Sequence, residues 1–62
     1  MYFRMYHIDP SGHFKDFKEI ETHDDETAIA IAQREAAGAQ FELWNEARLV
    51  MRHRIAASAL NE

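Results

Sequence analysis

The chain has 62 residues, of which 47% are hydrophobic and 11% aromatic, and its formal net charge is −4 with histidine neutral. This length allows one domain at most, the apolar fraction argues against disorder, and the acidic charge argues against indiscriminate nucleic-acid binding. The chain contains no cysteine, which excludes disulfides and thiolate sites, and no apolar run approaches the roughly 20 residues that span a bilayer.

Two strands are predicted at the start of the chain, over residues 2–8 and 13–21. The first is rich in aromatic residues, and residues 1–9 lack the apolar core of a signal peptide, so we expect a cytoplasmic protein. Between the strands, residues 9–12 (DPSG) suit a type I turn followed by a glycine bulge, because proline presets φ and glycine accepts a left-handed conformation. The resulting register places four apolar side chains on one face: Phe3, Met5, Phe14 and Ile20.

Residues 24–38 (DDETAIAIAQREAAG) predict a helix. Asp24 or Asp25 can accept hydrogen bonds from the free N–H groups of the first turn, and Gly38 suits the left-handed residue that follows a helix. A stripe with helical spacing lies between these ends: Ala28, Ile31, Ala32, Glu35 and Ala36. Because this stripe is mostly apolar, we expect the helix to cover one face of a sheet.

Residues 41–44 and 48–54 predict a second pair of strands, joined by a three-residue loop over residues 45–47. The register that this loop implies turns one set of side chains toward the helix: Phe41, Leu43, Leu49 and Met51. It turns another set to the opposite face: Glu42, Trp44, Arg48, Val50, Arg52 and Arg54. A two-residue loop would instead put Trp44 on the same side as Leu49, because a slip of one residue exchanges the faces.

These elements predict an α+β fold of the ββαββ type, in which one helix packs on one face of a four-stranded antiparallel sheet. We expect a single domain over residues 1–55. The favoured strand order is second, first, third, fourth, and the alternative places the fourth strand between the first and the third. Residues 56–62 form a C-terminal tail, either as a short helical turn or as a frayed end.

Three motifs resemble those of a group of short, uncharacterised bacterial proteins with a domain of unknown function. They are the D-x-x-G-H turn at residues 9–13, the acidic helix start D-D-x-x-A at residues 24–28, and the E-L-W-x-x-x-R-L-V segment at residues 42–50. The resemblance covers nearly the whole chain apart from the tail, although residues 45–47 lack the loop glycine of that group. It implies the ββαββ fold and attaches no activity to the chain.

Few residues suggest chemistry. Four histidines are present, but none has the spacing of a helical zinc motif: His7, His13, His23 and His53. Ser11 falls in the predicted turn and Ser58 in the tail, and neither has an obvious base nearby in the sequence. We therefore expect a protein that is not an enzyme, with no catalytic residue, cofactor or metal site.

The sheet face opposite the helix is the predicted contact surface, because a single helix covers only one face. The candidate interface residues combine aromatic rings with arginines, which are enriched where proteins bind one another: Tyr2, Arg4, Tyr6, Phe17, Trp44, Arg48, Val50 and Arg52. These residues favour a non-catalytic interaction module that self-associates or binds a protein partner, with a homodimer as the simplest form.

The alternative function is single-stranded nucleic-acid binding on the same face, because bases stack on aromatic side chains. Acidic residues offset the arginines along these strands and no RNP-type motif is present, so this alternative is the less favoured.

Overall fold

The computed structural model describes residues 1–55, and the predicted tail lies outside this range. The chain runs through two strands, a helix and two further strands, as predicted: β1 (Tyr2–Ile8), β2 (Phe14–Glu21), α1 (Asp25–Ala36), β3 (Phe41–Asn45) and β4 (Arg48–His53). The strands form one antiparallel sheet in the order β2-β1-β3-β4, which confirms the favoured topology. The α+β class and the ββαββ order are therefore confirmed.

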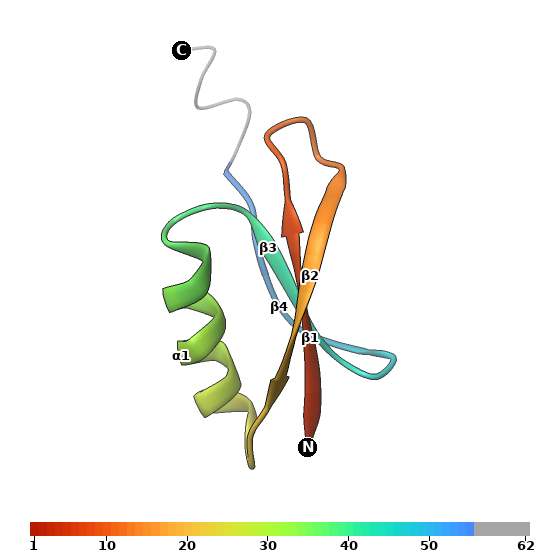
Figure 1. Ribbon diagram of the computed structural model, residues 1–62, viewed down its shortest axis with the longest axis vertical. Coiled ribbons are helices and arrows are strands. Elements are labelled where there is room, and N and C mark those ends of the chain that lie inside the picture. Colours follow the sequence, from red (N-terminus) through yellow and green to blue (C-terminus); the bar gives the residue numbers. More distant parts are fainter. Residues whose placement is uncertain (56–62) are drawn as a thin grey trace.

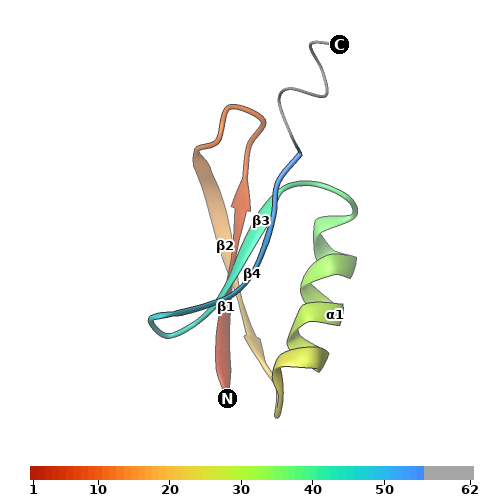
Figure 2. The same ribbon diagram turned by 180° about the vertical axis from the view of Figure 1, so that it is seen from behind.

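The helix lies along one side of the sheet (Figure 1), and the view from behind places it on the same side of all four strands (Figure 2). We call the sheet face toward α1 the inner face and the opposite one the outer face. The long connection through α1 carries the chain across the sheet, so that β3 pairs with β1 rather than with β2. Both hairpins consequently share one continuous inner face.

The ends of α1 show why this segment is helical. Asp24 is the N-cap, and its side chain accepts a hydrogen bond of 2.8 Å from the backbone N–H of Thr27. The hydrogen bonds from Thr27 lower the pKa of Asp24, because they favour the charged carboxylate. At the other end the left-handed cap is Ala37, with φ of 51°, one residue before the predicted Gly38. Gly38 follows with φ of 90°, so the chain turns through two consecutive residues of positive φ.

The core lies between α1 and the inner face. Three alanines of the predicted stripe are buried, at positions 28, 32 and 36, and their small side chains let the helix backbone approach the sheet. The bulk comes from the strands, which contribute five buried side chains to this cluster: Phe3, Met5, Ile20, Phe41 and Leu43. At about 0.8 kcal/mol per buried methylene, these larger residues supply most of the hydrophobic stabilisation.

The first hairpin has the predicted turn but a different register. Gly12 has φ of 94°, and the carboxylate of Asp9 accepts hydrogen bonds from the backbone N–H groups of Ser11 and His13. One residue of β2 is bulged, because His7 pairs with Asp16 while Ile8 pairs with Phe14. The bulge exchanges the faces beyond it. The prediction that Phe14 lies on the inner face is therefore wrong; its ring stacks on Tyr6 on the outer face.

The second hairpin also departs from its predicted register. Asn45 pairs with Arg48, which leaves a two-residue turn in which Glu46 has φ of 55°. A bulge then lies at Val50, because Leu43 pairs with Met51 while Trp44 pairs with Leu49. The predicted three-residue loop is therefore wrong.

Three face assignments on β4 change as a consequence. Val50 packs against the core and Leu49 is exposed, the reverse of the predicted arrangement. Arg48 lies on the helix side, where its guanidinium donates two hydrogen bonds to Asp25, at 3.0 and 3.1 Å. These hydrogen bonds lower the pKa of Asp25 by stabilising its charge.

Candidate functional site

The outer face is built from alternate residues of all four strands. The pairing of the strands sets these residues opposite one another across the sheet. Its members are Tyr2, Arg4, Tyr6, Phe14, Phe17, Glu19, Glu42, Trp44, Leu49 and Arg52. Six of the eight candidate interface residues are in this set, whereas Arg48 and Val50 belong to the helix side. Phe14 and Leu49 were missed as outer-face residues, because each lies between a turn and a bulge, where the register differs by one residue from the predicted one.

An exposed aromatic cluster occupies the part of this face over β1 and β2. The ring of Tyr6 stacks on Phe14, with centroids 5.0 Å apart, and contacts Phe17 at 5.9 Å. The guanidinium carbon of Arg4 lies 4.7 Å from the centroid of the Phe17 ring, within cation–π range. Phe14 and Phe17 remain 59% and 53% exposed, although large aromatic side chains are usually buried. The cluster is therefore ordered by its own contacts, while Tyr6 is partly buried and the two phenylalanines keep more than half of their surface exposed.

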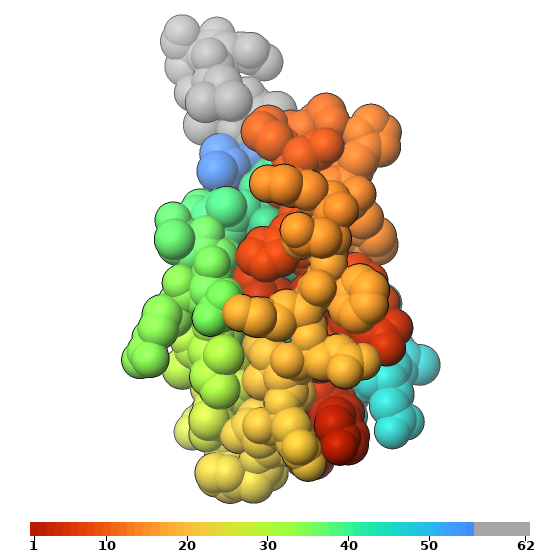
Figure 3. Space-filling model, in the orientation of Figure 1, coloured from red at the N-terminus to blue at the C-terminus, as the bar shows by residue number. Residues whose placement is uncertain are grey.

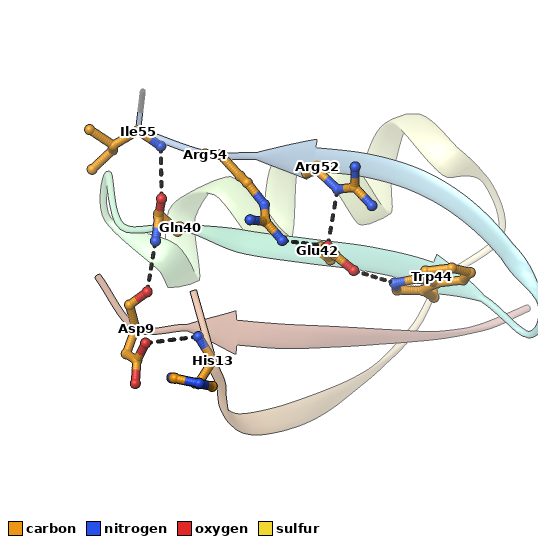
Figure 4. A network of polar contacts seen from close by, with 8 residues as sticks. All are labelled: Asp9, His13, Gln40, Glu42, Trp44, Arg52, Arg54 and Ile55. Atoms are coloured by element: carbon orange, nitrogen blue, oxygen red, sulfur yellow. Dashed lines mark hydrogen bonds and ion pairs between the residues drawn. The ribbon is translucent and has the colours of Figure 1, made fainter. Parts of the chain in front are cut away.

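A buried carboxylate organises the part of the face over β3 and β4. Glu42 is only 3% exposed, and its oxygens accept hydrogen bonds from Trp44 Nε1 at 3.0 Å and Arg52 Nε at 3.0 Å. Arg54 adds a longer bond of 3.4 Å to the oxygen that Arg52 contacts. Figure 4 shows the three donors converging on this carboxylate from both sides along β3.

The donors around Glu42 decide its charge. Burial raises the pKa of Glu42, because a carboxylate loses hydration there. The hydrogen bond from Trp44 and the charges and hydrogen bonds of Arg52 and Arg54 outweigh burial, and the pKa lies below its usual value. Glu42 is thus an anion at neutral pH that fixes the indole of Trp44 and two guanidinium groups on the outer face.

Gln40 joins the sheet to the segments at its end. Its Nε2 donates to the backbone carbonyl of Asp9 at 2.8 Å, and its Oε1 accepts from the backbone N–H of Ile55 at 3.0 Å (Figure 4). The amide of this buried residue therefore holds the β1–β2 turn and the end of β4 to β3. All buried side-chain nitrogen and oxygen atoms of the described residues have a hydrogen-bond partner, so no orphaned polar group marks a ligand site.

A hollow lies between the two parts of the outer face. It has a volume of about 300 Å³ and is lined mainly by Tyr2, Arg4, Tyr6, Glu19 and Trp44. A second hollow of about 260 Å³ adjoins it and shares Tyr6 and Trp44. Arg4 and Glu19 form an ion pair of 3.3 Å at the rim. The hollow is shallow, aromatic and of mixed charge, which suits a side chain of a protein partner.

The serine and histidine with possible catalytic chemistry lie away from the outer face. Ser11 does have a base nearby, contrary to the expectation, because its hydroxyl lies 2.9 Å from His13 Nδ1. The same hydroxyl donates to the carboxylate of Asp9 at 2.7 Å, so its proton is engaged by the turn rather than transferred to the histidine. In a catalytic triad the carboxylate orients the histidine instead. This trio is a turn network on the exposed tip of the first hairpin.

Within residues 1–55, no three histidine, aspartate or glutamate side chains gather as metal ligands would. His7 approaches Asp16 at 4.0 Å and His23 approaches Asp24 at 3.4 Å, in separate pairs. No helix of the described chain is long and apolar enough to cross a membrane.

The fold and the outer face define an α+β protein with a half-covered antiparallel sheet. Comparisons of the chain with protein-family models, with curated proteins and with solved structures found no match. The resemblance to short bacterial proteins therefore stays a prediction, and function has to be argued from the outer face itself.

Proposed function

We propose that the protein is a small non-catalytic interaction module that self-associates or binds a protein partner through its outer face. The observation that carries this proposal is the exposed aromatic cluster of Tyr6, Phe14 and Phe17 on the uncovered side of the sheet. Exposed apolar patches of this kind are characteristic of surfaces that bind other molecules. The expected cytoplasmic location stays a prediction.

The chemistry of the outer face favours a protein as the partner. Tyrosine, tryptophan and arginine dominate the side chains that contribute most to protein interfaces. The arginines here are already paired with carboxylates, Arg4 with Glu19 and Arg52 with Glu42. Rim charges held in this way contribute specificity while the rings contribute buried apolar area. A second copy of the chain is the simplest partner.

The proposal can be tested with Trp44, the single tryptophan of the chain, which lines both hollows. Mass by light scattering and the emission of Trp44 are followed together from about 1 μM to 1 mM, the range of weak interfaces. Association over the outer face predicts a rising mass and a blue shift of the emission. Leu49→Lys should suppress both effects, whereas Ala30→Lys, on the exposed side of the helix, should suppress neither. A monomeric mass with unchanged emission over the whole range would contradict self-association over this face.

Single-stranded nucleic acid is the second candidate, and a specific observation supports it. Tyr6, Phe14 and Phe17 form an open stacking platform beside the guanidinium of Arg4. Glu19 and Glu42 lie on the same face, however, and repel phosphates. This alternative predicts that a short oligonucleotide quenches Trp44 at low salt and that salt reverses the effect. Unchanged emission at low salt would contradict it.

A further inference from the structure

The exposed edge of the sheet at β2 has the properties of a strand that pairs with another strand. β2 is the first strand in the sheet order, and every residue from Phe14 to Glu21 except Ile20 is exposed. Figure 3 shows the side chains of β2 running along the near side of the molecule with no helix over them. An edge of this length offers unpaired N–H and C=O groups to a further strand.

The hydrogen bonds already made identify which groups are free. The N–H of Thr22 donates to the carbonyl of Met1, its direct opposite, so this is a pair whose residues exchange hydrogen bonds. Because such pairs alternate along an antiparallel ladder, the even-numbered residues of β2 from position 16 direct their backbone groups toward β1. Phe17, Glu19 and Glu21 therefore direct theirs away from the sheet.

Symmetry then restricts how two copies can pair. Two antiparallel β2 strands with their helices on the same side are related by a two-fold axis perpendicular to the sheet, so one residue must face itself. A centre at Lys15, Asp16, Lys18 or Glu19 places a like charge opposite itself, which is unfavourable. A centre at Phe17 places an uncharged ring there, and the outward backbone groups of Phe17 meet those of the partner copy.

The register centred on Phe17 also matches the flanking charges. It sets Asp16 opposite the partner copy's Lys18, and by symmetry Lys18 opposite the partner copy's Asp16. Next along the strand, Lys15, which lies at the bulge, is opposite the partner copy's Glu19, and Glu19 is opposite the partner copy's Lys15. Opposite charges directly across a pair of strands stabilise the pairing.

We propose that two copies of this chain pair through their β2 strands, antiparallel and centred on Phe17, so that the two four-stranded sheets become one continuous sheet. The other edge does not match itself. β4 contains two arginines and no carboxylate, so two copies of it offer no opposite charges to each other, and the bulge at Val50 interrupts its ladder. The bulge at Lys15 limits the length of the new ladder, so the interface is small and its dissociation constant falls between about 1 μM and 1 mM.

This inference rests on the self-association in the proposed function, and it places one contact between two copies at the β2 edge, beside the outer face. Pairing at β2 joins the two outer faces side by side and brings the aromatic clusters together at the axis. The rings of Tyr6 and Phe17 are in contact in each copy. The dimer thus presents one aromatic surface of twice the area to any further partner. Trp44 lies two strands away from this edge, so edge pairing alone leaves its emission unchanged.

A disulfide across the axis tests the register. The chain has no cysteine, so Phe17→Cys introduces a single thiol. In a hydrogen-bonded antiparallel pair the two Cα atoms lie about 5.5 Å apart, within the range that a disulfide bridges. Phe14→Cys is the matched control, an equally exposed phenylalanine on the same strand, whose thiols would lie about 20 Å apart in the dimer. We expect Phe17→Cys to form the disulfide-linked dimer at least about 10-fold faster under mild oxidation.

A charge exchange tests the same pairing without a cross-link. Asp16→Lys and Lys18→Asp each set like charges opposite each other in a homodimer and should raise its dissociation constant about 10-fold. An equimolar mixture of the two variants restores both opposite-charge pairs and should recover the dimeric mass. Glu35→Ala is the control for Lys18→Asp, because it removes the same 2.7 Å contact between Lys18 and Glu35 and leaves the edge charges in place.

The outcomes separate this inference from the proposed function. Equal oxidation rates for the two cysteine variants, or a mixture that stays monomeric, would overturn pairing centred on Phe17. If the wild type still dimerised in that case and Leu49→Lys dissociated it, association through the outer face would stand without the β2 ladder. A wild-type protein that remains monomeric at about 1 mM would overturn the edge pairing outright.

Discussion

The buried carboxylate of Glu42 should be the most sensitive polar group on the outer face. In Glu42→Gln one of the two acceptor oxygens becomes an NH₂ group, which cannot accept a hydrogen bond from the indole of Trp44 or from the guanidinium groups. The side chain keeps its size, so the change removes charge and one acceptor without opening a cavity. Three hydrogen bonds depend on this carboxylate.

The expected loss of stability depends on how exposed the three hydrogen-bond donors to Glu42 are. If the remaining oxygen serves Arg52 and Arg54, the N–H of the half-buried Trp44 loses its acceptor, at a cost of about 1–3 kcal/mol. The two arginines are about half exposed and recover hydration, so loss of charge assistance at each costs at most about 0.5 kcal/mol. We therefore expect Glu42→Gln to lower the free energy of unfolding by about 1–4 kcal/mol. A domain of this size has only about 3–9 kcal/mol in total.

Urea unfolding followed by far-ultraviolet circular dichroism measures this loss without relying on Trp44, whose surroundings the variant changes. Glu19→Gln is the matched control, because its carboxylate makes an exposed ion pair with Arg4 and should contribute less than about 0.5 kcal/mol. A loss of less than about 0.5 kcal/mol in Glu42→Gln as well would refute the reasoning, since it would mean that the three donors are equally satisfied by water.

Three further predictions follow from the same contacts. Because the pKa of Glu42 is lowered on folding, its contribution is fully present above the unfolded value of 4.5 and is lost as the pH falls through the lower folded pKa; stability should therefore drop more steeply below about pH 4.5 in the wild type than in Glu42→Gln, as urea titrations at each pH will show. Asp24→Ala removes the cap on the N–H of Thr27 and should cost about 1 kcal/mol by chemical unfolding, whereas Asp24→Asn, which keeps an acceptor, should cost a few tenths; equal losses would contradict the capping role. Val50→Lys should cost about 2 kcal/mol or more and Leu49→Lys about 1 kcal/mol or less, because Val50 packs against the core and Leu49 is partly exposed. A lower melting temperature for Leu49→Lys than for Val50→Lys would favour the three-residue loop instead.

Local chemistry specified the elements, and for that reason they were predictable. A carboxylate before an apolar stripe predicted the start of α1, and Asp24 does cap it. The DPSG segment predicted a tight turn, and Gly12 does adopt positive φ there. The helix end was less well specified, because Ala37 takes a left-handed conformation that its side chain disfavours. Few strand orders keep both hairpins intact and cross the sheet once through the helix, and for that reason the strand order was also predictable.

The assignments of side chains to the two sheet faces were wrong where the two-residue alternation of a strand is interrupted. A bulge adds one residue to one strand, and every side chain beyond it changes face relative to simple alternation. Nothing in the sequence around Lys15 or Val50 distinguishes a bulged residue from a paired one. The assignments of Phe14, Arg48, Leu49 and Val50 were wrong because these residues lie between a turn and a bulge or at the bulge itself. Beyond each bulge the register is displaced by a second residue, which restores the predicted faces, and Phe17 and Arg52 lie on the predicted face with Tyr2, Arg4, Tyr6 and Trp44.

The turns and bulges of the two hairpins also change which side chains lie on the outer face. Simple alternation would have buried Phe14 and Leu49 under a helix whose contact stripe is alanine, and would have left Val50 in solvent. The observed turns and bulges bring the ring of Phe14 onto Tyr6 and set Leu49 across from Trp44, while Val50 packs against the core beneath α1. Both shifts move a large apolar side chain from the inner to the outer face. Since exposing such side chains gives up hydrophobic stabilisation in a small domain, this enrichment supports the proposal that the outer face binds a partner.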